Sequence, residues 1–176
     1  NQRLGVLIPC GMMILTLFTG AAVAATDAPA DADVQLLHWQ DTVKPLLEKD
    51  NLMQVYEPES GNSWQLQALS LERHCDAEPV GKDDTRLMNE AFGNETTWAP
   101  KVVYIQLSGG DWTMATMHNT PHREDTIADN DFDGALCVHF LRDMAEAEEN
   151  DPVYGVQNRE VLREGWKQLT GETIAL

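Results

Sequence analysis

Basic residues are scarce in this chain. Of 176 residues, 12 are Lys or Arg and 29 are Asp or Glu, which gives a formal net charge of −17. Proteins that bind nucleic acid neutralise phosphates with Lys and Arg, and anionic lipid headgroups attract the same side chains. The composition therefore argues against nucleic acid and against an anionic membrane surface as partners. A surface this acidic is typical of a soluble protein.

Cysteine is scarce too, with three in the chain. Cys10 lies in an uncharged, largely apolar run at 4–25 that ends in small residues. This run predicts an export signal over residues 1–25, or an uncleaved membrane anchor, followed by an acidic linker over 26–33 and a single domain over 34–176. We therefore expect an exported protein of the periplasm or cell surface, where Cys75 and Cys137 could form one disulfide.

The chain has no internal repeats, and its apolar residues follow two periods. Alternation around glycine-containing turns predicts two β-hairpins and one further strand, at 52–57 with 63–69, 101–107 with 112–117, and 136–141. Helical spacing predicts helices at 34–49, broken by Pro45, at 81–93 and at 153–169. These elements give a β-rich α+β fold, a mainly antiparallel sheet or sandwich with flanking helices.

The segment 114–141 concentrates reactive residue types, with three of the five histidines and one cysteine. His118 ends a predicted strand, and Cys137 begins the next one 19 positions later. A thiol with a pKa near ~8.5 is mostly protonated at neutral pH, and a histidine within reach can act as its base. His118 and Cys137 are therefore a candidate base and nucleophile. An exposed tryptophan near this segment would favour glycan binding.

This pattern resembles the catalytic domain of bacterial L,D-transpeptidases. That family has His-Gly-Thr at a strand end and, a little under twenty residues later, Ser-His-Gly-Cys, an aliphatic residue and Arg. The chain has His-Asn-Thr at 118–120 and Gly-Ala-Leu-Cys-Val-His at 134–139. A closer similarity, over most of the part expected to be exported, is to a domain of exported bacterial envelope proteins. It is carried by His-x-Asp-x-Glu-Pro at 74–79, Pro-His at 121–122 and Asp-Asn-x-Phe-x-Gly at 129–134.

The resemblance implies an L,D-transpeptidase-like fold and an acyl transfer on peptidoglycan stem peptides without a cofactor. Cys137 would form a thioester, His118 would be the general base, and backbone amides at 136–137 would stabilise the oxyanion. His139 stands at the position of the family's Arg, which makes it a third candidate catalytic residue. The resemblance also suggests a set of substrate-binding residues: His74, Asp76, Asn119, His122 and Gly134.

Departures from the family pattern leave two alternatives open. Ala135 and Leu136 replace the His and Gly before the cysteine, which is consistent with a non-catalytic envelope-binding domain closed by a Cys75–Cys137 disulfide. A zinc-dependent peptidase is the second alternative, with His74, His118 and His122 as ligands. The chain contains no His-Glu-x-x-His spacing, and its acidic loop lacks the closing Glu of a calcium-binding loop.

Overall fold

The computed structural model describes residues 28–174. The prediction for residues 1–25 and the start of the predicted linker therefore lie outside the described part. In chain order the elements are η1 (Asp31–Asp33), β1 (Val34–Gln35), η2 (Trp39–Val43), α1 (Lys44–Leu47), β2 (Leu52–Tyr56), β3 (Ser63–Leu71), β4 (Cys75–Pro79), α2 (Lys82–Ala91), β5 (Lys101–Gln106), β6 (Trp112–Met117), β7 (Leu136–His139), α3 (Met144–Asn150) and α4 (Tyr154–Thr170).

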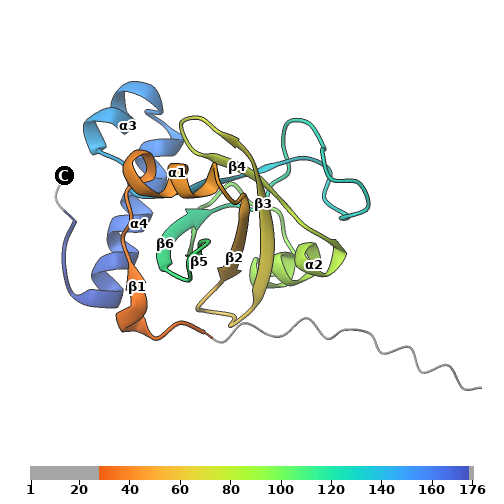
Figure 1. Ribbon diagram of the computed structural model, residues 1–176, viewed down its shortest axis with the longest axis horizontal. Helices are drawn as coiled ribbons and strands as arrows, with labels where there is room; N and C mark the ends of the chain where they lie inside the picture. Colours follow the sequence, from red (N-terminus) through yellow and green to blue (C-terminus); the bar gives the residue numbers. More distant parts are fainter. Residues whose placement is uncertain (1–27, 175–176) are drawn as a thin grey trace, which may run out of the picture.

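The antiparallel sheet closes on itself. The strand order is β1-β6-β5-β2-β3-β4-β7, and β7 also pairs with β6, so that β2 to β7 form a closed six-stranded barrel. β1 adds in parallel to one end of β6. The β-rich α+β prediction is confirmed, whereas the sheet forms a barrel and not a sandwich. Helices α3 and α4 lie on one side of the barrel and α2 on the other (Figure 1).

Alternation along the strands separates the barrel interior from its outer face. On β7, Leu136 and Val138 belong to the main hydrophobic core, whereas Cys137 does not. Cys137 and His139 are two residues apart, so they share the outer face. Helix α4 contacts β5, β6 and β7. It packs closely there, because a Cβ at Gly165 would lie 2.7 Å from a methyl carbon of Val102.

Most predicted elements are present, including both hairpins, α2 and α4. The predicted helix at 34–49 is wrong in its first part, because residues 34–35 pair with β6 and the helical segment begins at Trp39. Its Pro45 lies at the second position of α1, directly after the π-helical turn η2. The sequence patterns do not predict β4 or α3.

Candidate functional site

A cavity of about 260 Å³ lies between the outer face of β7 and the start of α4. Four of the five histidines line it together with Cys137: His74, His118, His122 and His139. The structure therefore brings together residues that the sequence singled out from segments up to 65 positions apart. Tyr154 and Asn158 of α4 cover the cavity, and Trp98 borders it from the segment between α2 and β5.

Strand register fixes most of these side chains. Cys137 pairs with Asp76 across β7 and β4, and His139 pairs with Thr116 across β7 and β6. His118 directly follows the end of β6. His122 reaches the site through a two-residue bridge to Ala135, with backbone hydrogen bonds of 2.9 and 2.7 Å. The cluster is thus carried mainly by rigid strands.

The imidazole closest to the sulfur is that of His122. Its Nε2 lies 3.3 Å from Cys137 Sγ. His118, the predicted base, instead accepts the backbone N–H of Cys137 at its Nε2 over 3.2 Å. The amide that the resemblance assigned to the oxyanion is therefore already donated to His118. His122, expected to bind substrate, is the side chain placed to accept the thiol proton.

Protonation states follow from burial. Burial, with smaller electrostatic contributions from His122 and His74, lowers the pKa of His118 to about 4. His118 is therefore a neutral imidazole at neutral pH, and its one acceptor nitrogen takes either the Cys137 N–H at Nε2 or the Thr120 N–H at Nδ1, each at 3.2 Å. Burial and the adjacent Asp76 raise the pKa of Cys137 to about 12, against the opposite effect of Arg123. At rest the Cys137 side chain is therefore a thiol and not a thiolate.

Asp76 is the charged centre of the cluster. Its Oδ2 accepts a hydrogen bond from Arg123 Nη1 at 2.7 Å, and its Oδ1 lies 3.2 Å from His74 Nε2. Burial acts to raise the pKa of Asp76, but the hydrogen bond with His74 and the charge of Arg123 outweigh it and lower that pKa. Asp76 is therefore an ionised carboxylate, and its Oδ1 lies 3.7 Å from Cys137 Sγ.

An aromatic group forms the mouth of the cavity. The ring centroid of Trp98 lies 4.6 Å from that of His118 and 5.3 Å from that of His122. Trp98 is 44% exposed and Tyr154 is 50% exposed, with centroids 5.9 Å apart. Trp98 meets the condition of an exposed tryptophan near the reactive segment. The sequence pattern of segment 114–141 could not predict that Trp98 lies at the site, because Trp98 is outside that segment.

Two of the expected substrate-binding residues have structural roles. Asn119 is fully buried, where its Oδ1 accepts the N–H of Thr97 and its Nδ2 donates to Glu95 O, both at 2.9 Å. A substrate cannot reach it. Gly134 has φ +139°, and a Cβ there would lie 2.8 Å from the carbonyl oxygen of His122. Gly134 therefore allows His122 to approach, and it does not itself line the cavity.

A buried carboxylate holds the loop between β6 and β7. Glu78 on β4 is fully buried and accepts the backbone N–H groups of Thr126 and Ile127 at 2.8 and 2.9 Å. It also accepts a hydrogen bond from Asn130 Nδ2 at 3.2 Å. Because the same loop carries His122, Glu78 helps to fix the imidazole beside the sulfur.

The expected disulfide does not form in this fold. Cys75 and Cys137 are both free and buried. Cys75 pairs with Val138, and Cys137 pairs with Asp76, on neighbouring positions of β4 and β7. Successive residues of a strand point to opposite faces, so Cys75 points into the barrel and Cys137 points out of it. A bond between them would require the strands to separate.

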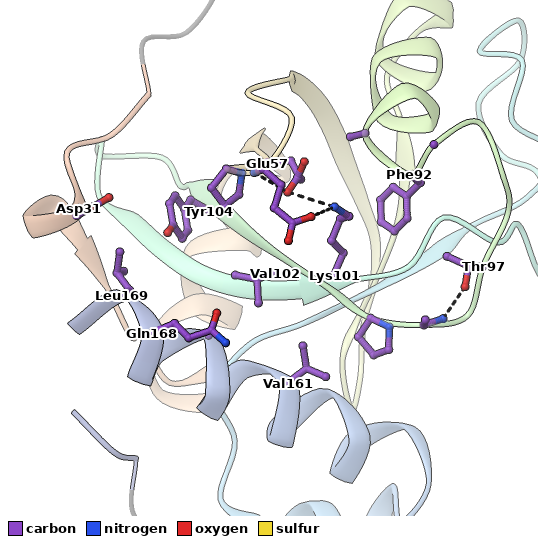
Figure 2. Close-up of a pocket in the computed structure, with 17 residues that line it drawn as sticks. Asp31, Glu57, Phe92, Thr97, Lys101, Val102, Tyr104, Val161, Gln168 and Leu169 are labelled. Atoms are coloured by element: carbon purple, nitrogen blue, oxygen red, sulfur yellow. Dashed lines mark hydrogen bonds and ion pairs between the residues drawn. The ribbon is translucent and has the colours of Figure 1, made fainter. Parts of the chain in front are cut away.

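A groove of about 810 Å³ continues along the same helix (Figure 2). Tyr154 and Asn158 of α4 line the cavity, and Val161, Gly165 and Gln168 line the groove. These residues recur every three or four positions, so they share one face of α4. Within the groove, Lys101 pairs with the carboxylates of Glu57 and Glu59.

The chain matches no known protein family model, and neither the curated proteins nor the solved structures contain a match to it. Within residues 28–174, no helix combines the length and the apolar character needed to cross a membrane.

Proposed function

We propose that this protein is an exported cysteine acyltransferase that acts on peptidoglycan stem peptides, and that its barrel is a diverged L,D-transpeptidase domain. The observation that carries the proposal is the contact of 3.3 Å between Cys137 Sγ and His122 Nε2 inside a cavity of about 260 Å³. A thiol and an imidazole at this distance form the pair that thioester chemistry requires.

The proposed reaction uses His122 to move one proton. Cys137 Sγ bonds to the carbonyl carbon of the stem peptide as its proton passes to His122 Nε2. The bond from that carbon to the nitrogen of the terminal D-alanine then breaks, and the imidazolium protonates the departing amine. An amine of a second stem attacks the thioester, and its proton returns through His122 to the sulfur. The products are the new amide and the free thiol.

The charges around the pair favour transfer during the attack. The thiol is not ionised at rest, since the pKa of Cys137 is raised to about 12. The Asp76 carboxylate lies 3.9 Å from His122 Nε2 and stabilises the imidazolium once it forms. Arg123 and Arg73 line the cavity and are the permanent cations available to the developing oxyanion.

The surroundings of the pair favour a polymeric substrate. Trp98 and Tyr154 are about half exposed at the mouth, and flat aromatic faces suit sugar rings and peptide planes. The groove along α4 gives space for chain beyond the reacting peptide (Figure 2). Its acidic side chains, Asp31, Glu57 and Glu59, outnumber Lys101 and favour a substrate that carries an amine.

The test is intact-mass analysis of the protein in chelator after treatment with a carbapenem or with iodoacetamide. We expect an adduct on Cys137 that Cys137→Ala lacks, and an unchanged rate of its formation in Cys75→Ala because Cys75 lies inside the barrel. In His122→Ala the carbapenem should react on the order of 100-fold more slowly, the usual contribution of a general base. Release of D-alanine from muropeptides would then identify the donor.

If the Cys137 thiol stays unmodified in folded, chelator-treated protein, the proposed enzyme activity is overturned. Binding of muropeptides without turnover would then support a non-catalytic envelope-binding domain. A reaction rate that is the same in His122→Ala as in the wild type would remove His122 from the mechanism.

A further inference from the structure

We infer that the cavity is also a binding site for a thiophilic divalent cation such as Zn²⁺. The site is centred on Cys137 Sγ, with His122 Nε2 and Asp76 Oδ1 as its nearest ligand atoms, and His74 and His139 lie around the same sulfur. The inference concerns binding and does not need the acyl transfer. Only its consequence, that the cation blocks the nucleophile, rests on the proposed function.

Cys137 Sγ, His122 Nε2 and Asp76 Oδ1 are spaced like one face of a tetrahedron around zinc. Zinc bonds of about 2.3 Å to sulfur and about 2.0 Å to nitrogen or oxygen place neighbouring ligands about 3.3–3.6 Å apart. Cys137 Sγ lies 3.3 Å from His122 Nε2 and 3.7 Å from Asp76 Oδ1. Asp76 Oδ1 lies 3.2 Å from His74 Nε2 and 3.9 Å from His122 Nε2. All four distances fall within about 0.6 Å of the ideal edge.

The fold holds these atoms in place before any cation binds. Cys137 and Asp76 are register partners on adjacent strands, and His74 directly precedes β4. Arg123 fixes the second carboxylate oxygen of Asp76 at 2.7 Å. Asp151 Oδ2 lies 3.7 Å from His74 Nδ1, on the side where a metal-binding histidine commonly has a carboxylate, although no hydrogen bond joins the two atoms.

An unsatisfied histidine supports the site independently. His139 is 3% exposed, and its Nδ1 is buried without a hydrogen-bond partner. Buried polar atoms are normally paired, so such an atom beside a cavity calls for a ligand. His139, His74 and Cys137 offer ligand atoms within 4.8 Å of one another, and His139 is thus a further ligand at the same position. His118 is a weaker candidate because its Nε2 already accepts the Cys137 amide.

The types of ligand select the cation. A thiolate and imidazoles favour Zn²⁺ and similar metals, whereas Ca²⁺ and Mg²⁺ prefer oxygen atoms. On binding, Zn²⁺ replaces the thiol proton, and one Zn–S bond forms as one proton leaves to solvent. Sulfur bound to zinc is a weaker nucleophile toward a carbonyl carbon, and the lone pair of His122 Nε2 that would take the proton is bound to the cation. Zinc and acyl transfer therefore exclude each other at Cys137.

The binding test titrates chelator-treated, dialysed full chain with Zn²⁺ against a chromophoric chelator, and repeats the titration with Co²⁺. We expect one ion per chain, a thiolate-to-cobalt charge-transfer band, and a rise in the melting temperature with Zn²⁺. Cys137→Ser and His74→Gln should each weaken the affinity for Zn²⁺ by on the order of 100-fold. His38→Gln is the matched control, because His38 lies outside the cavity and should leave binding unchanged.

The outcomes separate the two proposals. Absence of the charge-transfer band, or affinity for Zn²⁺ that is the same in Cys137→Ser and His74→Gln as in the wild type, would overturn the cation site and indicate adventitious binding to surface carboxylates. If Cys137→Ser does not fold, His74→Gln alone decides. A reactive thiol without zinc binding removes only this inference. If the protein binds zinc but its metal-free Cys137 thiol is inert, only the proposed acyltransferase activity is overturned.

Discussion

Replacement of Glu78 by Gln should loosen the loop that carries His122. The carboxylate accepts three hydrogen bonds, one at Oε1 from Thr126 and two at Oε2 from Ile127 and Asn130. Glutamine has almost the same shape but offers one oxygen and one NH₂ group. With the oxygen at the Oε2 position, the NH₂ group must face the N–H of Thr126. Two donors then oppose each other in a buried place.

The free-energy cost follows from these three bonds. A hydrogen bond to a charged group contributes about 1.5–3 kcal/mol, and a neutral one about 0.5–1.5 kcal/mol. The variant loses one charged bond outright and weakens two others by about 1 kcal/mol each. We expect the free energy of unfolding to fall by about 3–5 kcal/mol. Amide hydrogen exchange at Thr126 and Ile127 should rise, and carbapenem acylation of Cys137 should slow on the order of 10- to 100-fold as His122 shifts.

Glu57→Gln is the matched control for this experiment. Glu57 is also fully buried, and it accepts the N–H groups of Glu59 and Ser60 at 2.9 and 2.8 Å, but it lines the groove and not the cysteine cavity. Urea unfolding followed by tryptophan fluorescence should show a comparable loss of stability, with acylation of Cys137 nearly unchanged. A Glu78→Gln protein within about 1 kcal/mol of wild type would refute the reasoning. So would equal slowing of acylation in both variants.

Three further predictions concern packing and charge. Gly134→Ala should cost about 1–3 kcal/mol and slow acylation of Cys137, because its Cβ would meet the His122 backbone at 2.8 Å. Gly61→Ala is the control: Gly61 has φ +74° and open space around it, so Ala there adds backbone strain without a clash. Equal slowing of Cys137 acylation in Gly134→Ala and Gly61→Ala would contradict the prediction. Gly165→Ala should lower the melting temperature despite the better helix propensity of Ala, since its Cβ would meet Val102 at 2.7 Å; a higher melting temperature would show that Val102 can yield. Burial lowers the pKa of His118 to about 4, below the value of ~6.5 for an unfolded chain, so its contribution is complete above pH ~6.5 and is lost as the pH falls toward 4. In urea unfolding with chelator, we therefore expect His118 to lower the free energy of unfolding by about 2 kcal/mol at pH 5 relative to pH 7. If the loss of stability between pH 7 and pH 5 is no smaller in His118→Gln than in the wild type, the prediction is contradicted.

The parts of the fold that the sequence predicts are those whose signal is local. Both hairpins have short turns and alternating residues, and α4 ends at Gly171 with φ +79°. Strand β4 escapes prediction because Asp76 and Glu78 interrupt its apolar pattern, although every residue of the strand is buried. Partners from distant loop residues make that burial tolerable, and no local pattern encodes them.

The candidate site was predictable in its composition and less so in its geometry. Spacing and resemblance singled out Cys137 and the histidines that surround it. Which imidazole meets the sulfur depends on the path of the loop between β6 and β7, and the positive φ of Gly134 and the bonds of Glu78 set that path. Spacing alone could not distinguish His122 from His118, which lie four residues apart in one segment.

The closure of the barrel also determines when the site can exist during folding. The two hairpins join neighbours in sequence and can form quickly, whereas β7 must find β4 across 61 positions, as in the pair Asp76 and Cys137. The sulfur of Cys137 and the side chains that surround it in the folded protein stay apart until β7 docks. A chain that has not closed its barrel therefore carries an ordinary thiol without the imidazole of His122 beside it, and acylation of Cys137 that depends on His122 becomes a readout of completed folding.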